Sequence, residues 1–176
     1  DKKNNKKIVM GCAQLGANYG INNKAGKPSQ KKINQILNSA IKNNIKFFDT
    51  AREYKNSEKI IGNFFQINKS KKKEVQVITK LSSLKLISKK FNKKNIIKKV
   101  DESVFNSLKT LKQKKIDTLL VHKVSDLKIQ NGLVLNRLKQ LKKRKLIKNI
   151  GVSLQTPNEL SQVISDKDIN HIQLPM

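Results

Sequence analysis

Short apolar runs alternate along this chain with longer segments whose apolar residues recur every three or four positions. The short runs are rich in β-branched and aromatic residues and predict strands, whereas the longer period predicts helices. Strands are expected at 7–11, 47–49, 75–80, 116–122, 148–153 and 171–176. Helices are expected from a Ser29 cap, from a Ser57 cap, and over 94–111, 133–145 and 157–165. Six strands that alternate with five helices indicate a parallel sheet flanked by helices.

A dinucleotide-binding doubly wound fold also alternates strands and helices, so its fingerprint is the feature to look for. That fold needs a Gly-x-Gly-x-x-Gly turn after its first strand. Gly11, Gly16 and Gly20 follow the first predicted strand here, and their spacing is wrong for that turn. The sequence therefore favours another parallel α/β architecture.

Polar residues stand at or just after the carboxyl ends of the predicted strands. They are Asp49, Lys80, His122, Ser153 and Gln173, each on a different strand. The carboxyl ends of parallel strands meet at one edge of a sheet or one mouth of a barrel, where active sites are built. We therefore expect these side chains to gather in one site.

The chemistry of this group suits proton transfer to a carbonyl oxygen. A tyrosine with its ordinary pKa of about 10 is a weak acid at neutral pH unless a nearby cation stabilises the phenolate. Tyr54 follows Asp49 closely, Lys80 would supply the ammonium, and Asp49 would hold that ammonium in place. His122 would orient the substrate oxygen with its neutral ring. Helix capping and ordinary loop contacts are the alternative roles for each residue taken singly.

The segment around Tyr54 resembles the active-site signature of the aldo/keto reductases, in the form Asp49-Thr50-Ala51-x-x-Tyr54-x-x-Ser57-Glu58. Further matches to that family are Val77-Ile78-Thr79-Lys80, residues 107–122 leading to His122, Lys148–Ser153, and Ile172-Gln173-Leu174-Pro175. The family is built on a (β/α)8 TIM barrel and reduces carbonyls with NADPH or NADH. The resemblance implies that Asp49, Tyr54, Lys80 and His122 form the catalytic tetrad. It also implies that Gly11, Ser153 and Gln173 bind the cofactor, the last two through the nicotinamide carboxamide.

The first predicted strand and the loop after it resemble one branch of that family. The matching residues are Gly11-Cys12-Ala13-Gln14-Leu15-Gly16, Tyr19-Gly20-Ile21 and Gly26-Lys27. That branch is associated with surface-carbohydrate metabolism, so the resemblance implies an aldehyde or ketone substrate derived from a sugar.

Three features depart from the family pattern. Lys55 follows Tyr54 where glycine is common, and Leu154 follows Ser153 where many members carry asparagine. The chain also ends in the sixth predicted strand, which leads us to expect one incomplete barrel domain over 1–176. The aromatic that stacks on nicotinamide and the phosphate-binding residues would then be missing. Such a chain is expected to be weakly active or inactive and prone to self-association, with no oligomeric state predicted.

The charge of the chain suggests a different class of function. There are 39 Lys+Arg against 12 Asp+Glu, a formal net charge of +27. Three of these 39 are arginines, which leaves 39 − 3 = 36 lysines, and they are scattered along the whole chain. Biased codon usage explains this pattern, so we expect no specific nucleic-acid partner. A non-enzymatic polyanion binder remains one alternative function, and a barrel lyase that forms a Schiff base on Lys80 is another.

The cysteine content and the hydropathy of the chain indicate the compartment in which the protein is expected to act. Cys12 is the single cysteine, so no internal disulfide and no cysteine metal cluster can form. That fits a reducing compartment such as the cytoplasm. No apolar run approaches the roughly 18 residues of a membrane span, and we expect no membrane partner.

Overall fold

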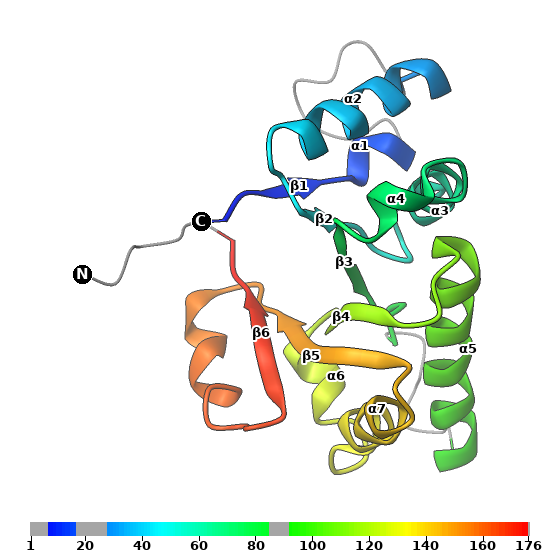
Figure 1. Ribbon diagram of the computed structural model, residues 1–176. Coiled ribbons are helices and arrows are strands. Elements are labelled where there is room, and N and C mark those ends of the chain that lie inside the picture. Colours follow the sequence, from blue (N-terminus) through cyan, green and yellow to red (C-terminus); the bar gives the residue numbers. More distant parts are fainter. Residues whose placement is uncertain (1–6, 17–27, 85–91, 176) are drawn as a thin grey trace.

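The computed structural model describes residues 7–16, 28–84 and 92–175. Its centre is a six-stranded parallel sheet whose strands follow one another in sequence order (Figure 1). The strands are β1 (Val9–Gly11), β2 (Phe47–Asp49), β3 (Gln76–Lys80), β4 (Ile116–Val121), β5 (Ile147–Ser153) and β6 (Ile169–Gln173). The predicted parallel sheet flanked by helices is confirmed.

The helices lie on the outer side of the curved sheet (Figure 1). The long ones are α2 (Gln30–Lys42), α3 (Ser57–Ile67), α5 (Lys93–Leu111) and α7 (Leu133–Lys143). Single helical turns form α1 (Ala13–Gly16), α4 (Lys69–Lys72) and α6 (Val124–Leu127), and the 3-10 helix η1 (Pro157–Gln162) precedes β6. Strands in sequence order with helices outside them make the six-unit part of a (β/α)8 barrel.

Apolar side chains on the outer side of the sheet hold the helices in place. In the first half of the chain, Phe48 and Val77 pack with Phe64 and Phe65 of α3. In the second half, the strand residues Leu119, Val121, Ile150 and Val152 pack with apolar residues of α5 and α7. Side chains alternate between the two sides of a strand, so the strand residues next to these, among them Asp49 and Ser153, face the concave side.

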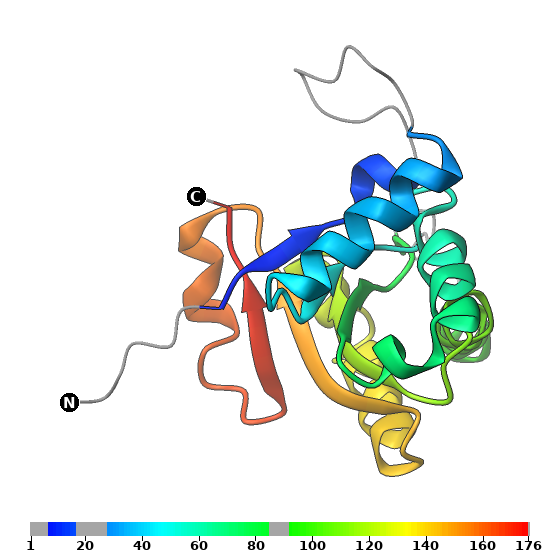
Figure 2. The same cartoon turned by 45° about the horizontal axis from the view of Figure 1, so that its top comes forward.

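The sheet is open between its first and last strands. Figure 2 shows β1 and β6 at the two ends of the curved wall. Within the described residues, each of these strands is hydrogen-bonded to one neighbour only, β1 to β2 and β6 to β5. The open edges therefore lie on either side of the concave face that carries the polar strand ends.

Two helix predictions differ from the structure. Ser57 does not cap α3: its hydroxyl donates a hydrogen bond to the carbonyl of Cys12 at 2.8 Å, and the cap position is Asn56. The segment after Pro157 ends earlier than predicted, as a 3-10 helix at Gln162. Its few apolar residues give it little surface to bury against the sheet, which is what stabilises longer helices. Ser29 does cap α2, since its hydroxyl accepts from the Lys32 amide at 3.3 Å.

Strand limits shift by small amounts, and β6 shifts most. It covers Ile169–Gln173, whereas the sequence predicts 171–176. Pro175 lacks an amide hydrogen and so cannot continue the ladder, which explains the earlier end. The sequence also does not predict α1, α4 or α6, because a single turn is too short to show a helical period.

Candidate active site

A buried ion pair forms the centre of the site. The Lys80 ammonium, at the end of β3, donates to both carboxylate oxygens of Asp49, at the end of β2, at 2.7 and 2.9 Å. A third hydrogen bond runs to the carbonyl of Thr50 at 3.2 Å. Lys80 is 3% exposed and Asp49 is 8% exposed. The three acceptors match the three N–H donors of an ammonium, so each donor of the Lys80 group has a partner.

Tyr54 lies against this ion pair. The Lys80 nitrogen is 5.2 Å from the centroid of the tyrosine ring, within the range of a cation–π contact. The loop between β2 and α3 carries Tyr54, and its amide donates to the carbonyl of Ala51 at 3.1 Å. The structure therefore brings Asp49, Lys80 and Tyr54 together, as the sequence predicts.

Two backbone features shape the loop that carries Tyr54: a close approach at Gly16 and a positive φ at Lys55. A Cβ on Gly16 would lie 2.2 Å from the Tyr54 carbonyl oxygen, so only glycine permits this contact between α1 and the loop. Lys55 has a φ of 47°, in the left-handed region that favours glycine. Lys55 stands where the family commonly has glycine, and it adopts a backbone conformation that glycine would adopt readily.

His122 follows β4 directly and faces the carboxylate of Glu53, the neighbour of Tyr54. Its Nδ1 is buried and has no hydrogen-bond partner within the described residues. The same nitrogen lies 3.9 Å from Glu53 Oε2. Glu53 also accepts from the Ser83 amide at 2.8 Å, which ties the loop after β3 to the same group. Burial raises the pKa of the nearby Asp126 carboxyl, and His122 and Lys123 lower it. His122 therefore lies among acidic groups at the same end of the sheet.

Gln173, at the end of β6, reaches the ion pair from another part of the sheet. Its amide nitrogen donates to Asp49 Oδ2 at 3.2 Å. Its amide oxygen is buried and has no hydrogen-bond partner within the described residues. A buried carbonyl oxygen without a donor costs free energy, and an incoming N–H group would relieve that cost. The oxygen is thus suited to the amide group of a nicotinamide carboxamide.

The other predicted cofactor contacts, Ser153 and Gly11, lie at the ends of β5 and β1. Ser153 is paired in register with Gln173 at the ends of β5 and β6, so both side chains project to the concave side. Gly11 pairs with Asp49 at the end of β1, and a Cβ there would meet nothing within 4 Å. Leu154 is 2% exposed and packs in the core on the helix side, so it offers no amide contact. The residues present fit a carboxamide held by Ser153 and Gln173.

Sequence reasoning does not find two titratable groups near the ion pair. Burial lowers the pKa of His171, on β6, while Asp49 raises it and Lys80 lowers it. Burial and, to a lesser extent, the Asp49 carboxylate together raise the pKa of the Cys12 thiol to about 12, although Lys80 lowers it. His171 begins a predicted strand instead of ending one, and Cys12 follows the first predicted strand as the start of a loop, so the sequence pattern singles out neither residue.

Parallel strands in sequence order, with a buried Lys–Asp pair and a tyrosine at their carboxyl ends, define a barrel of the (β/α)8 class. The chain belongs to the aldo/keto reductase family, whose model matches residues 7–175. The resemblance noted in the sequence is therefore confirmed at the level of the family. No curated protein sequence matches the chain significantly.

Solved structures of aldo-keto reductases share this fold. The aldo-keto reductase AKR11C1 from Bacillus halodurans, in its holo form, matches 97% of this chain with a TM-score of 0.72 and 20% identity. A Pseudomonas aeruginosa protein assigned to the same group matches 90% with a TM-score of 0.70 and 22% identity. Aldose reductase from Giardia lamblia matches 84% with a TM-score of 0.62 and 21% identity. The chain spans 53, 59 and 54% of these proteins respectively, a little over half of each.

The branch resemblance, membrane spans and metal ligands are the remaining points on which the sequence makes predictions. The segments 19–21 and 26–27, which carry part of the resemblance to a carbohydrate branch, lie outside the described residues. None of the helices in the described part of the chain combines the length and hydropathy that a bilayer crossing needs. Within the same residues, no group of three His, Cys, Asp or Glu side chains is arranged to hold a metal ion.

Proposed function

We propose that this chain carries the catalytic and carboxamide-binding half of an NADPH- or NADH-dependent reductase. Its substrate would be a small aldehyde or ketone, with a sugar-derived carbonyl compound as the expected class. The observation that supports this most strongly is the buried array of Asp49, Lys80 and Tyr54 at the carboxyl ends of β2 and β3. Membership of the aldo/keto reductase family agrees with it.

The roles of the residues follow from their positions. The bound cofactor supplies a hydride to the carbonyl carbon. Tyr54 donates a proton to the carbonyl oxygen, and the Lys80 ammonium beside its ring stabilises the phenolate that results. Asp49 fixes the ammonium in place through two hydrogen bonds. His122 orients the carbonyl oxygen at the mouth of the site, and Ser153 and Gln173 hold the carboxamide.

The lysine geometry argues against the Schiff-base alternative. A lysine that attacks a carbonyl must be neutral and free to move. The Lys80 nitrogen instead has three acceptors, two of them on a buried carboxylate. Borohydride trapping with a carbonyl compound tests this directly, since a reductase lysine is not labelled. Labelling of Lys80 would replace the reductase proposal with the lyase.

A pair of tyrosine variants tests the reductase proposal. The loss of NADPH absorbance is followed with a panel of aldehydes and ketones, including sugar-derived ones. Tyr54→Phe keeps the ring and removes the acid, so turnover is expected to fall about 100-fold or more while NADPH still binds. Tyr19→Phe, at the other tyrosine of the chain, is the matched control and is expected to retain turnover. Equal turnover in Tyr54→Phe and the wild type would remove Tyr54 from the role of acid.

The polyanion-binding alternative makes a different prediction. Binding driven by the net charge of +27 weakens steeply with salt and does not depend on Tyr54 or Gln173. NADPH binding that keeps its affinity in Gln173→Leu and falls only with salt would favour that alternative.

A further inference from the structure

Glu58, the second residue of α3, is a charged side chain buried on the helix side of the sheet. The residue is 2% exposed, and its carboxylate accepts four hydrogen bonds. The proposed chemistry does not use it, because Asp49 and Lys80 project to the opposite, concave side. Burial of a carboxylate costs free energy that its partners must offset, so this contact set calls for an explanation.

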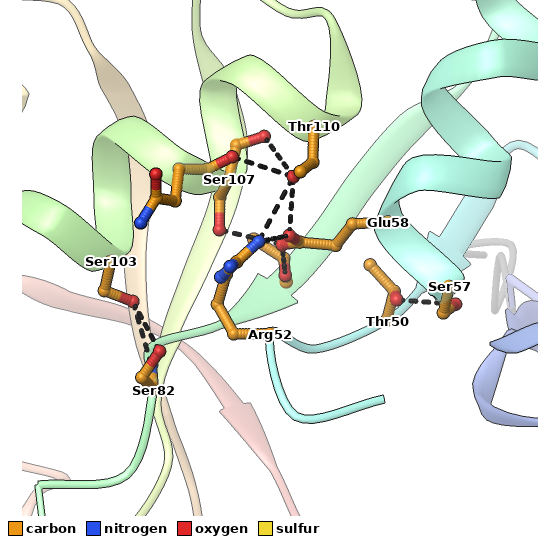
Figure 3. A network of polar contacts seen from close by, with 10 residues as sticks. Thr50, Arg52, Ser57, Glu58, Ser82, Ser103, Ser107 and Thr110 are labelled. Carbon is orange, nitrogen blue, oxygen red and sulfur yellow. Dashed lines mark hydrogen bonds and ion pairs between the residues drawn. The ribbon is translucent and has the colours of Figure 1, made fainter. Parts of the chain in front are cut away.

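The four donors fall into two pairs, one pair on each carboxylate oxygen. Figure 3 labels three of them, Arg52, Ser107 and Thr110. Oε1 accepts from the hydroxyls of Thr79 at 2.7 Å and Ser107 at 2.8 Å. Oε2 accepts from the Arg52 guanidinium at 2.6 Å and the Thr110 hydroxyl at 2.8 Å. Each oxygen thus has one donor from α5 and one donor from a segment next to the active site.

The donors next to the active site are close to its central residues in sequence. Thr79 immediately precedes Lys80 on β3, and strand alternation directs the two side chains to opposite sides of the sheet. Arg52 lies two residues before Tyr54 in the loop between β2 and α3. The Arg52 amide also donates to the Lys80 carbonyl at 3.3 Å. A single carboxylate therefore joins the strand that carries Lys80 to the loop that carries Tyr54.

We propose that Glu58 is a positioning residue: its carboxylate fixes the Tyr54 loop against the end of β3 and so sets the placement of the Tyr54 ring over Lys80. This rests on the proposed function only for its effect on turnover. The ion pair with Asp49 holds Lys80 from the concave side, and Glu58 holds the backbone of the same strand from the helix side. A misplacement of about 1 Å in a reacting group lowers rates by about 100-fold, so this clamp matters for the chemistry.

The paired donors provide a matched test. Thr79→Val and Ser107→Ala each remove one hydroxyl from the same oxygen, but only Thr79 belongs to the strand that bears Lys80. Amide hydrogen exchange of peptides covering 50–56 reports the position of the loop without any need for activity. The kcat and KM for a carbonyl substrate report the placement of Tyr54. Urea unfolding midpoints show whether the two variants lose similar stability.

Exchange in 50–56 is expected to rise about tenfold in Thr79→Val, with kcat down about tenfold and KM within twofold. Ser107→Ala is expected to leave exchange and kcat within about twofold, and Thr79→Ser, which keeps the hydroxyl, to restore both. Equal effects of Thr79→Val and Ser107→Ala on exchange would show that Glu58 only stabilises the fold. A wild-type chain that neither binds NADPH nor turns over a carbonyl substrate would overturn the proposed function, while the exchange comparison would still decide the clamp.

A second pair of variants, Arg52→Met and Arg137→Met, tests the proposal if Thr79→Val fails to fold. Arg52→Met removes the cation of the Arg52–Glu58 pair, and Arg137→Met removes that of the Arg137–Asp101 pair between α7 and α5. The two arginine side chains are similarly exposed, at 24 and 20%. Faster exchange in 50–56 for Arg52→Met alone supports the clamp. Unchanged exchange in Arg52→Met would overturn it.

Discussion

Gln173 donates a hydrogen bond to the Asp49 carboxylate at 3.2 Å, across 124 residues of sequence. The two residues belong to β6 and β2, which are not neighbours in the sheet. The contact therefore depends on the curvature of the sheet, which brings the ends of distant strands to the same point (Figure 2). It joins a residue of the proposed carboxamide site to the carboxylate that holds the central lysine.

Replacing Gln173 is expected to weaken NADPH binding more than it disturbs the Asp49–Lys80 ion pair. Gln173→Leu removes the buried amide oxygen that lacks a donor, and with it the hydrogen bond proposed for the carboxamide. NADPH affinity, measured by fluorescence titration, is expected to fall by about tenfold or less, the range of one hydrogen bond. Gln155→Leu, at an exposed position, is the control and should bind NADPH as the wild type does. Unchanged affinity in Gln173→Leu would remove it from the cofactor site.

Removing one member of the Asp49–Lys80 pair is expected to destabilise the fold strongly. Lys80→Met leaves the Asp49 carboxylate buried without its cation, which costs about 3 to 5 kcal/mol in comparable buried pairs. Urea unfolding followed by circular dichroism measures this change. The double variant Asp49→Asn/Lys80→Met removes both charges, so its loss should be smaller than the sum of the two single losses. Additive losses would mean that the two side chains do not interact in solution.

The strand ends are the part of the site that the sequence predicts well. The apolar runs before Asp49 and Lys80 show where β2 and β3 stop, and a parallel sheet then brings these two residues to one edge. Gln173 stands at the end of β6 because Pro175 ends that strand earlier than the sequence predicts. The family signature adds Tyr54 and its role. The function of Glu58 is not visible in the same way, because a glutamate in the first turn of a helix is ordinary. Its partners Thr79 and Ser107 are distant in sequence, and only the packing of α3 between β3 and α5 brings them together.

The loop that carries Tyr54 offers a stability test at Lys55. A residue with a side chain at a φ of 47° is strained relative to glycine, which adopts the left-handed region freely. Lys55→Gly is therefore expected to raise the free energy of unfolding by about 0.5 to 1 kcal/mol, after the greater entropy of unfolded glycine is subtracted. Chemical denaturation of the purified variant provides the measurement.

A second lysine-to-glycine change serves as the control for Lys55→Gly. Lys59 is exposed in α3, where a glycine costs about 1 kcal/mol relative to a good helix former. Lys59→Gly should therefore lower the stability, and the two substitutions should have opposite signs. A loss of stability in both variants would show that Lys55 does not adopt the left-handed conformation in solution.

The pH dependence of stability should show the effect of His171. Burial lowers the pKa of this histidine below its ordinary 6.5 in the folded chain. As the pH falls through 6.5, the unfolded chain takes up a proton at His171 before the folded chain does. The unfolded state then binds more protons, so the free energy of unfolding decreases as the pH decreases. Well above pH 6.5 both states are neutral at this position, and His171 adds no pH dependence there.

The variant His171→Gln isolates this contribution from those of other groups. Other acidic groups titrate in both proteins and cancel when the two are compared, among them Asp126, whose raised pKa acts in the opposite direction. Thermal unfolding is measured from about pH 8 down to about pH 5 for both proteins. The difference in stability should stay constant above pH 6.5 and then shift in favour of His171→Gln as the pH falls. Parallel curves at every pH would mean that His171 titrates alike in the folded and unfolded chains, and so is not partly buried near the Asp49–Lys80 pair.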